Sequence, residues 1–130
     1  MAFVRTLTTD TRTLQNPTWA DVEAAIRQLD AKTQTLVILA PRLPDDTSES
    51  HMAIGGGRGD LCVVYVTEDN LRFWNLEDPT KPDGSVRMVV GGQEGEYRPA
   101  QCVSRSWALK AAQTYFETGT RPDDLPWVAT

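Results

Sequence analysis

Residues 51–66 read H-M-A-I-G-G-G-R-G-D-L-C-V-V-Y-V, and this stretch decides the fold. We expect a strand at His51–Ile54, a glycine-dense turn at Gly55–Asp60 and a second strand at Leu61–Val66. Glycine adopts positive φ angles at low cost, so a tight turn is the natural use of Gly55–Asp60. Leu61–Val66 is apolar at consecutive positions, which is typical of a central strand covered on both faces.

The remaining chain adds one helix near each end and further short strands. Thr18 is placed to cap a helix, and apolar residues follow at helical spacing from Trp19 to Leu29. A second helix is predicted from Arg105 to Thr118, capped by Ser104 or Ser106 and with Gly119 in the left-handed position after its end. Further strands are expected at Met1–Thr8, Thr35–Ala40, Leu71–Leu76, Val86–Val90 and Ala100–Val103.

The connections are polar. Loops or turns are predicted at Thr9–Asn16, Arg42–Ser50, Glu77–Ser85 and Gly91–Pro99, and the tail is expected to dock Leu125, Trp127 and Val128 onto the body. These elements define an α+β fold: a mainly antiparallel sheet of six to seven strands packed by an N-terminal and a C-terminal helix. At 130 residues we expect one domain spanning residues 1–130.

Composition restricts the partners. The chain has 18 acidic and 13 basic residues, a net charge of −5, which argues against direct nucleic-acid binding and permits a basic protein partner. No apolar run reaches the ~20 residues of a membrane span, and the N-terminus does not resemble a secretory signal. We therefore expect a cytoplasmic protein whose Cys62 and Cys102 are buried thiols.

We find no motif for catalysis, cofactors or metal ions. The glycines of Gly55–Asp60 enter a strand without the Lys-Ser/Thr of a phosphate-binding loop, and His51 has no partner set for a nucleophilic triad or a zinc site. Glu94 and Glu96 share a glycine-flexed turn and leave open a carboxylate-based enzyme, although such residues are more often simply solvated. We expect no cofactor.

A possible binding surface comes from adjoining strands and one turn. Aromatic and charged residues together are typical of protein-binding hot spots, and the candidate set is Trp74, Arg87, Gln93, Glu94, Glu96 and Tyr97. The set forms one patch if Arg72, Trp74 and Arg87 share a face with the turn. The alternative is that Trp74 faces the core beneath a helix.

Several short blocks, in this order, resemble a known family. They are Trp19 and Val22, M-A-I-G-G-G-R-G-D-L, V-V-Y-V, F-W-N-L, V-V-G-G-Q with Tyr97 and Pro99, A-L-K-A-A-Q-T-Y-F-E-T-G, and the terminal P-W. The sequence resembles the first family of the Imm immunity proteins, which belong to bacterial polymorphic toxin systems.

This resemblance implies a small cytoplasmic α+β protein that binds and neutralises a cognate toxin, often a nucleic-acid deaminase. A deaminase admits a polyanion to its active site, so its mouth should be basic and an acidic protein could occlude it. The acids expected at the interface are Asp45, Asp46, Glu77, Asp78, Glu94 and Glu96, with Trp74 and Tyr97 as anchors. The competing hypothesis is a stand-alone interaction or regulatory domain without a toxin.

Overall fold

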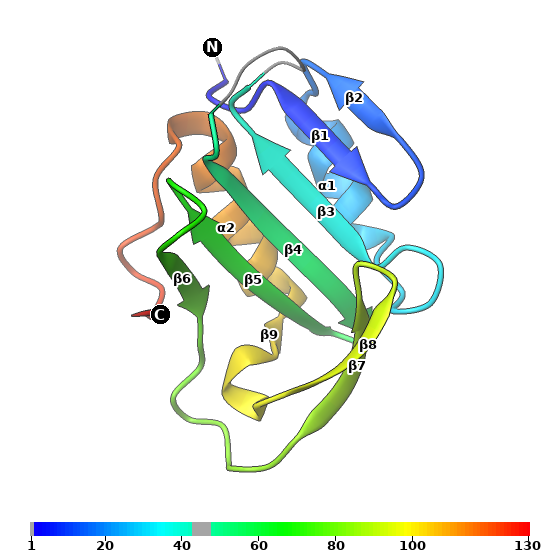
Figure 1. Ribbon diagram of the computed structural model, residues 1–130, viewed down its shortest axis with the longest axis vertical. Helices are drawn as coiled ribbons and strands as arrows, with labels where there is room; N and C mark the ends of the chain where they lie inside the picture. Colours follow the sequence, from blue (N-terminus) through cyan, green and yellow to red (C-terminus); the bar gives the residue numbers. More distant parts are fainter. Residues whose placement is uncertain (1, 43–47) are drawn as a thin grey trace.

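The computed structural model describes residues 2–42 and 48–130, which form two α-helices, ten strands and a short 3₁₀ helix (Figure 1). The helices are α1 (Trp19–Arg27) and α2 (Arg105–Thr118). The strands are β1 (Thr6–Thr9), β2 (Thr13–Gln15), β3 (Leu36–Ala40), β4 (His51–Arg58), β5 (Leu61–Thr67), β6 (Phe73–Leu76), β7 (Val86–Val90), β8 (Gln93–Tyr97), β9 (Val103–Ser104) and β10 (Trp127–Ala129).

Eight strands form one sheet, and β7 and β8 form a separate hairpin. The sheet order is β10-β6-β5-β4-β3-β1-β2, with β9 paired to one end of β5, and every strand pair in the described residues is antiparallel. Both helices cover one face of this sheet, while the hairpin crosses the lower end of the other face (Figure 1). The predicted α+β class, with an antiparallel sheet and a helix from each end of the chain, is confirmed.

The predicted number of strands, six to seven, is too low. Strand β2 lies in the predicted loop Thr9–Asn16, β8 lies in the predicted turn Gly91–Pro99, and β10 lies in the tail. These strands are short and mostly polar or exposed, so no apolar alternation marks them, and they form because a neighbouring strand offers backbone partners. The predicted strand Ala100–Val103 is correct only at Val103, which begins β9, because Pro99–Gln101 forms the 3₁₀ helix.

Helix α1 begins, and α2 both begins and ends, where the capping residues predict, while α1 ends at Arg27, before the predicted apolar position Leu29. The Thr18 hydroxyl accepts a hydrogen bond from the Asp21 N–H at 3.2 Å, and the Asp21 carboxylate accepts one from the Thr18 N–H at 2.8 Å, which completes a capping box. Ser104 caps α2 through the Trp107 N–H, and Gly119 ends it with a φ of 73°. None of the helices in the described residues is long and apolar enough to span a membrane.

The core lies between the helices and the sheet. Small residues on one face of α2, at positions 108, 111 and 112, have no exposed surface, so the helix backbone approaches β4 and β5 closely. Tyr115 and Phe116 complete this stripe, and Phe116 contacts the Trp19 ring with centroids 5.9 Å apart. In the tail, Leu125 is buried and Trp127 packs against the core, as expected. Val128 docks through the pairing of β10 with β6, but its side chain is 44% exposed.

The glycine-dense segment is not the predicted turn. Strand β4 runs through Gly55, Gly56 and Gly57 to Arg58, with a bulge between Gly56 and Arg58, and the chain reverses at Gly59 and Asp60. A Cβ atom on Gly57 would lie 2.4 Å from the Leu29 carbonyl carbon, and the φ of Gly57 is +88°. The glycines are therefore needed partly for close packing against the strand, and not only for a turn.

Both cysteines are buried and free, as predicted. Burial raises the pKa of the Cys62 thiol to about 11, so the group is protonated at neutral pH. It is a small apolar core side chain rather than a reactive thiol.

Candidate protein-binding surface

The β7–β8 hairpin holds most of the predicted site residues. Its two-residue turn, Gly91-Gly92, has φ angles of 62° and 78°, which suit the turn type that matches strand twist. Because side chains alternate along a strand, Met88, Val90 and Tyr97 share the inner face of the hairpin. Arg87, Glu94 and Glu96 lie on the outer face.

Two glycines of β4 let the inner face rest directly on the sheet. A Cβ atom on Gly55 would lie 2.4 Å from the Val90 side chain, and one on Gly56 would lie 2.1 Å from the Met88 sulfur. Met88 is 2% exposed as a result. The G-G-G sequence therefore positions the hairpin, a role that a pattern read along one strand does not reveal.

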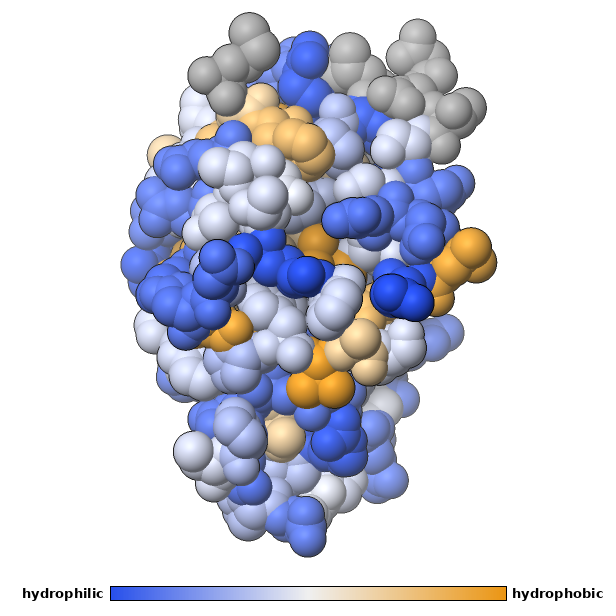
Figure 2. Space-filling view, turned by 90° about the vertical axis from the view of Figure 1, so that its left-hand side faces the viewer, coloured by the Kyte–Doolittle hydropathy of each residue, from blue (hydrophilic) through white to orange (hydrophobic). Residues whose placement is uncertain are grey.

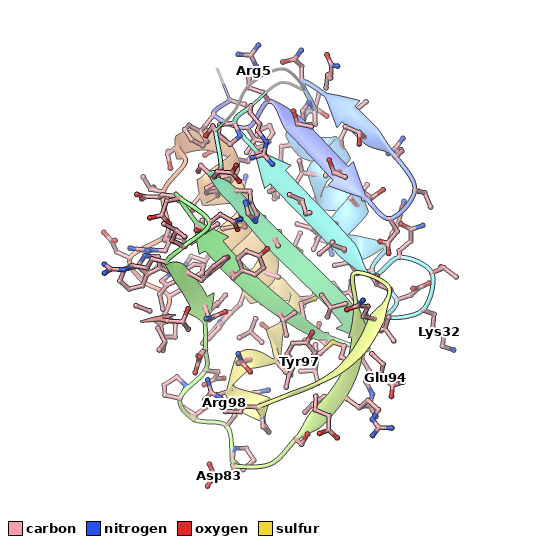
Figure 3. The ribbon with its side chains drawn as sticks, viewed as in Figure 1. Arg5, Lys32, Asp83, Glu94, Tyr97 and Arg98 are labelled. Atoms are coloured by element: carbon pink, nitrogen blue, oxygen red, sulfur yellow. The ribbon has the colours of Figure 1, made fainter. Side chains whose placement is uncertain are left out.

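The outer face carries one cation between two carboxylates. The Arg87 guanidinium lies 3.2 Å from the Glu94 carboxylate and 3.6 Å from the Glu96 carboxylate. All three side chains are more than half exposed. Gln93 is also exposed, but it pairs with Val90 and so lies on the opposite side of the hairpin strands, next to the turn. Figure 3 shows Glu94 on the outer side of the hairpin and Tyr97 between the hairpin and the sheet. The outer face of the hairpin is thus an exposed surface with excess negative charge.

Two successive hydrogen bonds hold the tip of the hairpin. The Gly92 N–H donates to the Thr35 hydroxyl at 2.9 Å, and that hydroxyl donates to the Asp10 carboxylate at 2.6 Å. The same carboxylate accepts from the backbone N–H groups of Thr35 and Leu36. Burial acts to raise the pKa of Asp10, but the hydrogen bonds from Thr35 and Leu36 outweigh it and leave the pKa below its usual value. Asp10 was not among the residues selected from the sequence, because its partners lie 25 or more positions away.

Glu77 and Asp78 have structural contacts. Glu77 is 7% exposed, and its carboxylate accepts a hydrogen bond from the Arg98 guanidinium at 2.8 Å. Asp78 accepts from the backbone and hydroxyl groups of Thr80 within its own turn, and the hydroxyl bond is the main cause of its lowered pKa. Asp45 and Asp46 lie outside the described residues.

Trp74 does not lie with the hairpin. It pairs with Val66, a core residue, so its side chain lies on the helix-covered face of the sheet, opposite the hairpin. The proposed single patch of Arg72, Trp74 and Arg87 is therefore not formed. Trp74 is half-buried, and the Arg121 guanidinium lies 3.8 Å from its ring centroid, a cation–π contact.

The side of the molecule that carries the C-terminal segment is mostly hydrophilic. Figure 2 shows hydrophobic side chains there as separate spots among polar ones. A hollow of about 590 Å³ on the described surface is lined by Trp74, Arg72 and Arg121 together with acidic residues of the β5–β6 turn. This side has mixed charge and is not a continuous apolar patch.

The open face of the sheet holds residues that the sequence did not indicate. Tyr65 on β5 contacts His51 and Phe73 edge-to-face, with ring centroids 5.5 and 5.2 Å apart, and its hydroxyl lies 3.0 Å from His51 Nε2. All three are half-exposed. The expectation that Leu61–Val66 is covered on both faces is correct only where the hairpin lies, because a hairpin with two five-residue strands cannot span the sheet. The Tyr65 hydroxyl, a polar group within an otherwise apolar run, is the sequence signal that could have indicated this face.

These features define a two-layer α+β protein whose exposed functional groups suit protein binding. Among the described residues there is no cluster of three or more His, Cys, Asp or Glu side chains that could hold a metal ion. The family model described as immunity protein Imm1 matches residues 10–129. The chain therefore belongs to the Imm1 family, a family of immunity proteins of toxin systems. No curated protein matches it.

Proposed function

We propose that this protein neutralises a cognate nucleic-acid deaminase toxin by binding over its active site. The family assigns it to immunity proteins, which act through a toxin partner. The observation that carries the finer proposal is the outer face of the hairpin, where Glu94 and Glu96 are exposed beside a single arginine. A rigidly anchored acidic surface can compete with a polyanionic substrate for a basic active-site mouth.

Two of the acids expected at the interface have structural partners that argue against this role. Glu77 is buried against Arg98, and Asp78 accepts hydrogen bonds within its own turn, so we place the proposed contact at Arg87, Glu94 and Glu96, with the exposed Gln93 at the adjoining hairpin tip. Two exposed carboxylates beside one guanidinium do not form the shielded environment that tunes an acid–base pair, which favours binding over catalysis by Glu94 and Glu96. We extend the proposal to the cytoplasm, where a toxin attacking the genome of the producing cell would have to be met.

Charge reversal on the hairpin tests the mechanism. The double variant Glu94→Lys/Glu96→Lys should weaken binding to the purified toxin domain encoded by the neighbouring gene by about 100-fold, since close interfacial charge pairs contribute about 1.5 kcal/mol or more each. The affinity of the wild type should also fall with added salt more steeply than that of the variant. Calorimetry at low and high salt, with a parallel deaminase assay, measures both effects.

The matched control reverses two acids on the helices. Glu23 and Glu117 lie on α1 and α2, on the other side of the sheet, and Glu23→Lys/Glu117→Lys changes the net charge by the same amount. Its affinity should stay within about threefold of the wild type. If both double variants lose the same affinity for the toxin domain, the effect comes from the overall charge of the protein, and the hairpin contact is refuted. Tight binding without inhibition of deamination would refute active-site occlusion.

A further inference from the structure

The open face of the sheet has an uncharged centre. The strand registers place seven side chains in one row across it: Thr13, Thr8, Ile38, Ala53, Tyr65, Asn75 and Val128. Neighbouring positions on this face are Leu36, Gly55 and Val63, and His51, Thr67 and Phe73. None of these side chains is an acid, a lysine or an arginine, although such residues make up 24% of the chain. Aromatic residues with depleted charge are typical of the centre of an interface.

A socket lies where the hairpin meets this face. It has a volume of about 130 Å³ and lies between the sheet residues Ala53, Val63 and Tyr65 and the hairpin residues Val90 and Tyr97. An apolar cavity of about 150 Å³ can hold benzene, so the socket has the size of one large apolar side chain.

The socket is accessible and has polar groups at its edge. Val63, Tyr65, Asn75 and Tyr97 are half-buried, so each keeps part of its surface in contact with solvent. In the described part of the chain, the Asn75 amide and the Tyr97 hydroxyl have no hydrogen-bond partner, so they are free to bind the backbone of an incoming segment. A hydrophobic cavity with a few polar groups around it is the usual form of a pocket for an anchor residue.

We infer that the toxin domain inserts one large apolar or aromatic side chain into this socket and covers the uncharged face around it. This inference rests on the proposed function. The same hairpin that closes the socket with Val90 and Tyr97 carries Glu94 and Glu96 on its outer face, so a toxin seated there would meet the acids at the rim. A basic partner also complements a chain of net charge −5, whereas a second copy of the chain would be repelled.

Filling the socket should abolish the anchor contact. The Asn75→Phe variant places a ring at the socket edge on a strand that tolerates aromatic residues, and we expect it to weaken binding to the purified toxin domain about 30-fold or more. Asn75→Ala keeps the socket open and should change the affinity by less than about tenfold. The control Gln113→Phe adds the same ring at an exposed position of α2, on the other side of the sheet, and should bind within about threefold of the wild type.

Methyl NMR of the wild-type complex supplies an independent measurement. With protonated toxin and a deuterated, methyl-labelled immunity protein, methyl groups of Leu36, Val63 and Val90 should show intermolecular contacts. Their absence would overturn the inference, and this holds even if Asn75→Phe fails to fold.

The outcomes separate the two proposals. If the wild type binds the toxin and a folded Asn75→Phe variant binds equally well, the socket is not the anchor site, while the proposed function stands. If the wild type does not bind the toxin, the proposed function fails and the inference with it. A dimer in sedimentation that Asn75→Phe disrupts would assign the socket to a second copy and overturn the toxin as its occupant.

Discussion

At the scale of single residues, the three consecutive glycines of β4 have different neighbours. Gly55 and Gly56 lie under hairpin side chains, which can shift, whereas Gly57 lies against the backbone of Leu29 at the end of the α1 segment. A backbone neighbour cannot move without displacing the helix. Gly57 should therefore be the least replaceable of the three.

The variant Gly57→Ala tests this point. The clash and the positive φ together should cost on the order of 2–5 kcal/mol of unfolding free energy, from about 1–2 for the left-handed backbone and about 1–3 for overpacking. Gly59→Ala is the control, because its φ is +61° but no atom lies within 4 Å of the added Cβ. Urea denaturation should show a loss for Gly59→Ala of only about 1 kcal/mol. If Gly57→Ala and Gly59→Ala lose the same unfolding free energy, the positive φ alone explains why glycine occupies position 57.

At the scale of elements, Arg105 joins the ends of three segments. Its guanidinium donates hydrogen bonds to the carbonyl oxygens of Ile26 at 2.6 Å, Leu29 at 3.0 Å and Gly59 at 2.7 Å. These carbonyls belong to the end of α1, the residues after it and the β4–β5 turn, and Arg105 itself is the first residue of α2. A planar group with five donors can satisfy several carbonyls at once, which an ammonium group cannot.

Arg105→Lys should consequently destabilise the fold by about 2 kcal/mol, since a lost hydrogen bond to a charged group contributes about 1.5–3 kcal/mol. Arg27→Lys is the matched control: Arg27 makes one exposed pair with Glu23, and such pairs contribute about 0.3–0.5 kcal/mol. Thermal unfolding of both variants gives the comparison. If Arg105→Lys leaves the free energy of unfolding unchanged, water must replace the guanidinium at these carbonyls.

At the scale of the whole molecule, aspartates that accept local hydrogen bonds link stability to pH. The pKa is lowered at Asp21, Asp30, Asp69, Asp78 and Asp124, in each case first by a hydrogen bond to the carboxylate. The pKa of Asp10 is also lowered. Through its hydrogen bonds with Thr35, this residue joins the β1–β2 turn to β3 and to the hairpin tip. A carboxyl whose folded pKa is depressed stabilises the fold above its unfolded pKa and loses that contribution as the pH falls through the folded pKa.

The variant Asp10→Asn should therefore be less stable than the wild type at pH 7, by about 1–2 kcal/mol for one lost charge-assisted contact. This difference should shrink as the pH falls below the usual aspartate pKa of 3.8. Asp83→Asn is the control, because Asp83 makes no hydrogen bond or ion pair within the described residues and extends away from the body (Figure 3). Urea denaturation at several pH values measures both. A difference independent of pH would show that the Asp10 carboxylate is not held in its charged form.

The sequence alone determined the helices, the apolar strands and the fold class. Capping residues and periodic apolar positions are local signals, and Thr18, Ser104 and Gly119 act in the structure as their positions indicate. The order of the short glycine-containing and tryptophan-containing motifs along the sequence also indicated a resemblance to the immunity family, and the match to the family model confirms it.

Only the tertiary structure decided which face each candidate residue occupies. Trp74 and Tyr97 are both partly buried aromatic residues of short strands, yet one contacts Arg121 behind the sheet and the other lines the socket in front. A polar strand such as β8 exists because β7 offers it backbone partners, and β7 reaches the sheet because Gly55 and Gly56 leave room. These outcomes depend on contacts between residues distant in the chain, which no local pattern encodes.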